Sequence, residues 1–157
     1  MRLSIFLFML CISQLLTAQS EAKILSMINE IRESGCRCGN KYMNAAPSLH
    51  WNDKLERSAK NYANHLKQTG RFSHYSADGK DIGDRIDAVG YNWMLVGENI
   101  AEGQKNIDEA IEDWMESPSH CTMIMNPEVT EMGLARTGSH WVQHFGKPMP
   151  SQKAKKK

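Results

Sequence analysis

Hydrophobic side chains recur at helical spacing in three segments of the chain, and each segment is predicted to form an amphipathic helix. The first covers residues 20–34 and ends at Gly35, because glycine is the usual residue just after a helix. The second covers about residues 53–70. The third covers residues 107–116, and Pro118 is expected to stop it.

Polar residues at the starts of these segments suggest helix caps. Asp53 with Glu56 forms an acidic relative of the capping box, and Asn106 or Asp108 caps the third helix. A shorter helix is predicted over about residues 81–89.

Strand-like patterns dominate the later part of the chain. Residues 91–101 carry aromatic and branched side chains typical of a strand. Residues 130–137 and 140–146 are predicted to pair as antiparallel strands around the turn at 137–139. Residues 36–50 are expected to be irregular, because glycine, proline and serine interrupt them.

The order of these elements indicates the fold class. The chain has neither internal repeats nor an alternation of strands and helices that would indicate a parallel sheet. We therefore expect an α+β sandwich with an antiparallel sheet.

The first residues have the pattern of a secretory signal peptide. Arg2 precedes an apolar stretch at 3–16, and cleavage is expected after Ala18, which gives a signal peptide of residues 1–18. The alternative, an uncleaved membrane anchor, requires a longer apolar stretch. We expect a secreted or periplasmic protein without a stable membrane anchor.

The remaining chain is long enough for one domain with a hydrophobic core. Without Arg2 it carries 18 basic and 18 acidic residues, so its charge gives no support for nucleic-acid binding. The basic run KAKKK lies in residues 148–157, which we interpret as a disordered tail.

Three cysteines remain after signal cleavage: Cys36, Cys38 and Cys121. In an exported protein they should form one disulfide and leave one thiol. Cys36 and Cys38 are too close in sequence to pair easily, so Cys121 should pair with one of them. A zinc site is the competing interpretation, although this cysteine spacing is weak for zinc.

Three polar residues stand in distinctive contexts: His74 in a turn-rich segment, Glu98 in an apolar stretch, and His120 after the third predicted helix. Two imidazoles and a carboxylate are suited to a divalent ion or a polar ligand. Each also has a simpler interpretation, and a buried Glu98 could pair with Arg85 or a backbone amide. His144 is rated lower, because strand alternation directs it away from the face of its aromatic neighbours.

Seven phrases of the sequence, taken in order, resemble the CAP superfamily, also called the SCP domain, and in particular its compact bacterial branch. The resemblance spans about residues 22–147, and its phrases are NEIRESGCRCG at 29–39, LHWNDKLERSAKNYA at 49–63, FSHYSADGKDIGDRIDAVGYNW at 72–93, VGENIAEG at 96–103, DWMESPSHCTMIMNP at 113–127, EMGLA at 131–135 and HWVQHFG at 140–146.

The resemblance implies a three-layer α-β-α sandwich with a central antiparallel sheet and a cleft that collects two histidines and two acidic residues. By motif position these are His74, Glu98 and His120, with Glu116 as the nearest candidate for the second acid. Glu116 stands one residue early, about 100° round the helix from the expected position.

The resemblance also implies a Cys38–Cys121 disulfide with Cys36 free, and it suggests several ligands. Family members are linked to lipid or sterol binding, ion binding and protein interaction, so we expect a binding protein whose partner is a small ligand or an extracellular protein. No cofactor is required, although His74 and His120 suit a divalent ion such as zinc. The alternative is an ion-assisted, peptidase-like hydrolase, which has little support because the chain lacks the usual catalytic motifs.

Overall fold

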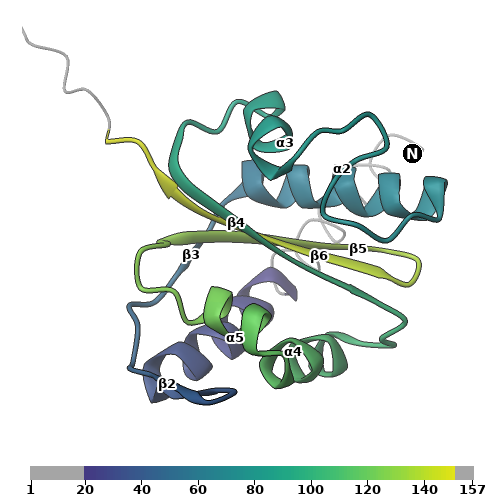
Figure 1. Cartoon of the computed structure of the whole chain (residues 1–157). Coiled ribbons are helices and arrows are strands. Elements are labelled where there is room, and N and C mark those ends of the chain that lie inside the picture. Colours follow the sequence, from purple (N-terminus) through teal and green to yellow (C-terminus); the bar gives the residue numbers. More distant parts are fainter. Residues whose placement is uncertain (1–19, 151–157) are drawn as a thin grey trace, which may run out of the picture.

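A four-stranded sheet lies in the middle of the molecule between two helical layers (Figure 1). The computed structural model describes residues 20–150, so the expected signal peptide and the end of the basic tail lie outside the described residues. The strand order is β3 (His50–Trp51), β5 (Glu131–Thr137), β6 (His140–Pro148) and β4 (Trp93–Glu102). The long pairs β5–β6 and β4–β6 are antiparallel as expected, and the two-residue β3 runs parallel to β5.

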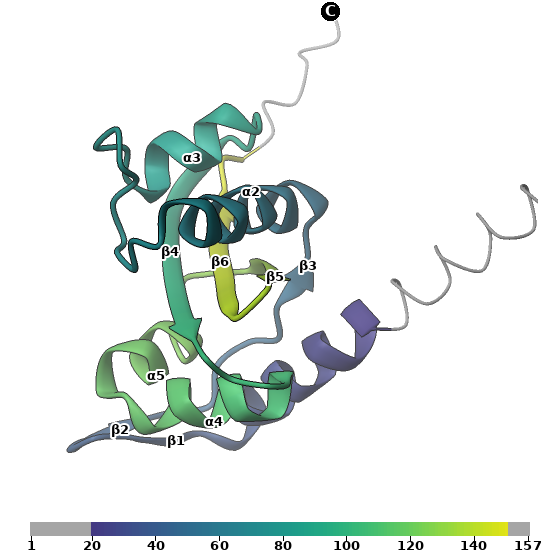
Figure 2. The same cartoon turned by 90° about the vertical axis from the view of Figure 1, so that its right-hand side faces the viewer.

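The helices divide between the two faces of the sheet (Figure 2). Helices α2 (Asp53–Thr69) and α3 (Ile82–Ala88) cover one face. A helix over residues 20–34, α4 (Ile107–Glu116) and α5 (Pro118–Ile124) cover the other. The three-layer α+β sandwich expected from the resemblance is therefore confirmed.

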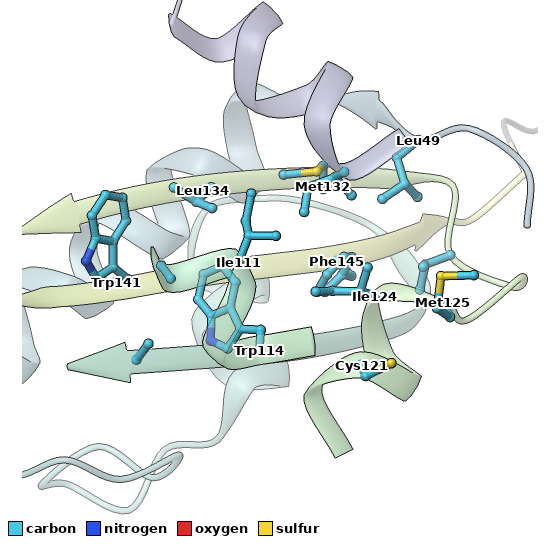
Figure 3. Close-up of a cluster of buried hydrophobic side chains, with 14 of the residues drawn as sticks. Leu49, Ile111, Trp114, Cys121, Ile124, Met125, Met132, Leu134, Trp141 and Phe145 are labelled. Atoms are coloured by element: carbon cyan, nitrogen blue, oxygen red, sulfur yellow. The ribbon is translucent and has the colours of Figure 1, made fainter. Parts of the chain in front are cut away.

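Strand alternation divides the hydrophobic core into two parts, one on each face of the sheet. Trp141 and Phe145 of β6 point into the larger one, where they join Trp114 of α4 and Ile124 of α5 (Figure 3). Val142, between them in sequence, points to the opposite face and packs against α2. The period of two that the sequence suggested for the last strand thus decides which helical layer each side chain meets.

Helix α2 lies unusually close to the sheet at Gly133 of β5. A Cβ atom at this position would overlap the backbone of Leu55 and Glu56 in α2. Backbone atoms cannot rotate out of the way as side chains do, so this contact requires glycine.

The segment expected to be irregular contains a small hairpin. β1 (Cys36–Cys38) and β2 (Lys41–Met43) pair in antiparallel fashion, with Cys36 opposite Met43 and Cys38 opposite Lys41. Strands of three residues carry too little pattern to be recognised in the sequence.

One helix cap and one additional helix also differ from the expectation. The N-cap of α2 is Asn52, whose side-chain oxygen accepts hydrogen bonds from the backbone N–H groups of Lys54 and Leu55. Helix α4 ends at Glu116 as expected, but Pro118 then begins a further helix, α5, because the first helical position tolerates a missing N–H.

Candidate functional site

Glu98 lies near the middle of β4, the edge strand of the sheet, and its side chain is only 3% exposed. The register of β4 and β6 sets it opposite His144, and His144 Nε2 lies 2.9 Å from Glu98 Oε2. A carboxylate this deeply buried requires strong partners. The structure supplies them from three different elements.

Arg85 of α3 is the second partner. Its guanidinium donates to Glu98 Oε2 at 2.7 Å and to the backbone carbonyl of His74 at 3.1 Å. It also lies over the ring of Tyr62, with its central carbon 3.6 Å from the ring centre, and the Tyr62 hydroxyl donates to the carbonyl of Ser73. Arg85 and Tyr62 therefore fix the segment that carries His74.

His74 is the third partner. Its Nδ1 lies 2.7 Å from Glu98 Oε1, while its side chain remains 53% exposed. Burial tends to raise the pKa of Glu98, but the hydrogen bonds from His144 and His74 and the charge of Arg85 lower it to about 2. The carboxylate is ionised at neutral pH, so Nδ1 of His74 carries the proton. In the neutral ring Nε2 is then a free acceptor or metal ligand.

His144 is completely buried on the same face of the sheet. Burial lowers its pKa, and the neighbouring Glu98 carboxylate only partly opposes this effect. The ring is therefore neutral at neutral pH and donates from Nε2 to Glu98. Its buried Nδ1 has no hydrogen-bond partner among residues 20–150.

His120 belongs to the opposite helical layer, in the first turn of α5 (Figure 2). Its backbone carbonyl accepts a hydrogen bond from the side chain of Asn99, which follows Glu98 on β4 and points to the other face. Burial, and then the positive charge of a protonated His74, lower the pKa of His120. The charge of a protonated His74 therefore acts on His120, and in the described part of the chain the ring of His120 has no hydrogen-bond partner.

Glu116 is set apart from this group. It ends α4, is exposed, and its side chain makes no hydrogen bond or ion pair within residues 20–150. Its membership of the site stays a prediction.

A metal ion at this edge would have few protein ligands. Within residues 20–150, one group of three histidine, cysteine or acidic side chains has its ligand atoms within 4.8 Å of one another, and that group consists of the three cysteines. Nε2 of His74 and the ring of His120 could supply two ligands. Glu98 would orient the ring of His74 through its hydrogen bond with Nδ1. Such a site would complete its coordination with water or a ligand group.

The cysteines pair as the resemblance implied. Cys38 and Cys121 form a disulfide, which ties the β1–β2 hairpin to α5, and Cys36 is free.

Sequence reasoning named Arg85 only as an alternative partner of Glu98, and it set His144 aside. The alternation argument placed His144 on the correct face, but only the register of β4 against β6 brings it opposite Glu98. The contact of Arg85 with the ring of Tyr62 depends on how α3 packs on α2, which the sequence pattern does not reveal.

Comparison with known proteins agrees with this architecture. The sequence model of CAP, described as the Cysteine-rich secretory protein family, matches residues 25–145. Two proteins of Bacillus subtilis (strain 168) are similar in sequence: the uncharacterised YkwD, 33% identical over 99 residues, and the uncharacterised membrane protein YlbC, 26% identical over 126 residues. The matches cover 62% and 80% of this chain but 38% and 34% of those proteins, so the chain spans little more than a third of their length.

Two solved structures have a similar fold. An extracellular SCP-domain protein of Bacillus anthracis gives a TM-score of 0.73 at 24% identity and covers 83% of this chain and 41% of that one. An outer surface protein of Borrelia burgdorferi gives a TM-score of 0.70 at 25% identity and covers 82% and 92%. In residues 20–150, no helix is long and apolar enough to cross a membrane. The family match over residues 25–145 and the shared three-layer fold show that this chain belongs to the CAP family of cysteine-rich secretory proteins.

Proposed function

We propose that this protein is an exported binding module whose ligand contacts His74 and His120 at the edge of β4. The observation that carries the proposal is the orientation of His74. Glu98 holds its Nδ1 at 2.7 Å, while Nε2, on a ring that is half exposed, has no hydrogen-bond partner within residues 20–150. An oriented acceptor of this kind suits a small polar ligand or a divalent ion such as zinc.

Exposed aromatic rings flank the same histidine. Phe72 is 47% exposed and Tyr75 is 59% exposed. Rings of this size offer apolar contact area beside the polar His74 edge. They support a ligand that combines an apolar surface with a hydrogen-bonding or metal-ligating group.

The alternative of a hydrolase is weaker, because Glu98 is a poor general base. A general base works best with a pKa near the working pH, whereas the pKa of Glu98 is lowered to about 2 and both of its oxygens accept hydrogen bonds. The carboxylate is therefore better suited to orienting His74 than to accepting a proton from water. Export is supported by the similar proteins described as an extracellular protein and an outer surface protein.

Calorimetric titration with zinc tests the ion-binding form of this proposal. We expect the wild type to bind zinc and the double variant His74→Ala with His120→Ala to lose binding, with affinity falling on acidification because protonated imidazole cannot ligate. His50→Ala is the matched control, because His50 is exposed on β3 and its side chain has no hydrogen bond within the described residues. Equal affinity in the double variant would exclude the β4 edge as the ion site.

A groove on the opposite helical layer supports a lipid ligand as a second candidate. It has a volume of about 530 Å³ and lies between the helix at 20–34 and α4. Its lining is mostly apolar and includes Met27, Ile31, Ile111 and Met115. An open, apolar groove of this volume suits an apolar ligand such as an acyl chain.

Native mass spectrometry after incubation with a long-chain fatty acid tests this second candidate. We expect a bound fatty acid on the wild type and on Met94→Glu, where the methionine is exposed and lies outside the groove. Met115→Glu puts a charge into the groove and should abolish the adduct. A wild type without any adduct, or an equal adduct on Met115→Glu, would rule out the groove as a lipid site.

A further inference from the structure

Three cysteine sulfurs meet where the β1–β2 hairpin packs on α5. Cys36 and Cys38 are two residues apart on β1, so strand alternation directs both side chains to the same face. Cys121 of α5 lies against that face and is bonded to Cys38. The free sulfur of Cys36 lies 3.8 Å from the sulfur of Cys121. A thiol therefore stands in contact with one end of a disulfide.

The three sulfurs differ in their access to solvent. Cys38 is 3% exposed and Cys121 is fully buried. Cys36 is only partly buried and lines the open groove between the helix at 20–34 and α4. A small reagent in solution can thus reach Cys36, while the disulfide itself is shielded.

We propose that Cys36, Cys38 and Cys121 form a thiol–disulfide exchange centre. In the first step the thiolate of Cys36 attacks Cys121 Sγ, so that a Cys36–Cys121 bond forms and the Cys38–Cys121 bond breaks. Cys38 leaves as a thiolate and takes up the proton that Cys36 gave up. The step is an internal exchange that needs neither oxidant nor reductant.

The exchange moves the disulfide from a shielded to an accessible position. A low-molecular-weight thiol entering the groove can then attack Cys36 Sγ, forming a mixed disulfide with Cys36 and releasing Cys121 as a thiolate. A second thiol resolves the mixed disulfide and regenerates Cys36. The centre consequently exchanges electrons with external thiols through Cys36, although the resting disulfide is buried. Burial raises the pKa of the Cys36 thiol, so the first step proceeds through a small thiolate fraction and should be slow.

Reduction kinetics with glutathione test this proposal. The oxidised protein is incubated with excess reduced glutathione, and samples are quenched in acid, alkylated and weighed by mass spectrometry to count free thiols. We expect the wild type to lose its disulfide at least about tenfold faster than Cys36→Ser, because the variant must be attacked directly at a buried bond. Equal rates in the two proteins would overturn the proposal.

A matched variant distinguishes the position of the thiol from its mere presence. Ser34 lines the same groove, but its hydroxyl bonds back to the carbonyl of Glu30 on its own helix. Adding Ser34→Cys to Cys36→Ser should therefore leave reduction slow, and full recovery of the wild-type rate would contradict the role given to Cys36. Independently, Cys38→Ser incubated with oxidised glutathione should form the Cys36–Cys121 disulfide while the glutathione is reduced, and peptide mapping detects that bond. Two free thiols in a folded Cys38→Ser protein would also overturn the proposal.

Discussion

Glu98 and His144 face each other across β4 and β6, with the carboxylate oxygen 2.9 Å from the imidazole nitrogen and both side chains shielded from water. The same carboxylate holds Arg85 and His74. One buried negative charge thus joins the sheet, α3 and the segment that carries His74. The position of the exposed histidine depends on this buried group.

Replacing Glu98 with glutamine should destabilise the protein strongly. The variant keeps the shape of the side chain but leaves the guanidinium of Arg85, which is 9% exposed, without its counter-charge. Breaking a buried ion pair from one side costs roughly 3–5 kcal/mol. Urea unfolding of Glu98→Gln checks this value, and Glu116→Gln, at an exposed position, should change the free energy of unfolding by less than about 0.5 kcal/mol. A loss below about 1 kcal/mol for Glu98→Gln would mean that the network is not coupled to the fold.

The lowered pKa of Glu98 should make the fold sensitive to acid. Its pKa is about 2 in the folded protein against an ordinary value of 4.5, so below pH 4.5 the unfolded chain binds a proton that the folded protein resists. The lowered pKa of Glu98 therefore adds about 3 kcal/mol to the free energy of unfolding. This stabilisation is complete above pH 4.5 and is lost as the pH falls toward 2. Unfolding free energies measured from pH 6 to pH 2 should show this decline in the wild type and a smaller one in Glu98→Gln.

His144 should make the stability of the fold depend on pH in a second, higher pH range. Burial lowers its pKa below the ordinary value of 6.5, so the unfolded chain again binds the extra proton. Stability should therefore fall as the pH drops below 6.5, before Glu98 begins to contribute. His144→Gln should flatten the curve between pH 7 and pH 5, and a curve as steep as that of the wild type would contradict a neutral, buried His144.

The close approach of α2 to β5 predicts that Gly133→Ala is poorly tolerated. The new methyl group would overlap the backbone of Leu55 and Glu56, and moving a helix away from a sheet opens a gap in the core. We expect a loss of about 3 kcal/mol in thermal or urea unfolding. Gly79→Ala is the control, because its Cβ meets nothing within 4 Å and its cost, about 1 kcal/mol, comes from the positive φ alone. Similar losses for both variants would show that steric overlap at Gly133 is relieved at little cost.

The elements of the fold that depend on the local spacing of apolar residues could be predicted from the sequence. The helix at 20–34, α2 and α4 each repeat apolar residues every three or four positions, and their bounds were predicted to within about two residues. The β1–β2 hairpin was missed, because three-residue strands show no period. The helix α5 was missed because Pro118 can end one helix or begin another.

Site residues could be predicted from the sequence only where they stand in a motif that resembles the family. His74 and Glu98 were grouped by the family resemblance, and their side chains lie 2.7 Å apart. His144 could not be grouped with them, since its contact with Glu98 comes from the register of two strands separated by 37 residues of chain between Glu102 and His140. Arg85 was weighed as a single partner, whereas it contacts Glu98, the backbone of His74 and the ring of Tyr62 together.

The other helical layer also contains a buried arginine. Arg32, from the helix at 20–34, is completely buried, and burial lowers its pKa to about 10, so it remains charged at neutral pH. It makes no ion pair within the described residues. Its guanidinium instead donates to four backbone carbonyls, those of Pro47, Ile124, Asn126 and Val129. These carbonyls lie in the segment that follows β2, at the last residue of α5 and in the segment that follows α5, so a single side chain attaches all three to the first helix.

Replacing Arg32 with methionine should therefore destabilise the protein by at least about 3 kcal/mol, because several carbonyls would lose their donor in a place that water does not reach. Arg32→Lys should recover only part of the loss, since one ammonium group cannot reproduce the several N–H donors that the planar guanidinium group directs at these carbonyls. Arg37→Met is the matched control: Arg37 is exposed and its side chain makes no hydrogen bond or ion pair within residues 20–150, so its replacement should cost less than about 0.5 kcal/mol. Urea unfolding with the disulfide intact measures all three. Equal stability of Arg32→Met and Arg37→Met would mean that the segments after β2 and α5 are held by apolar packing alone.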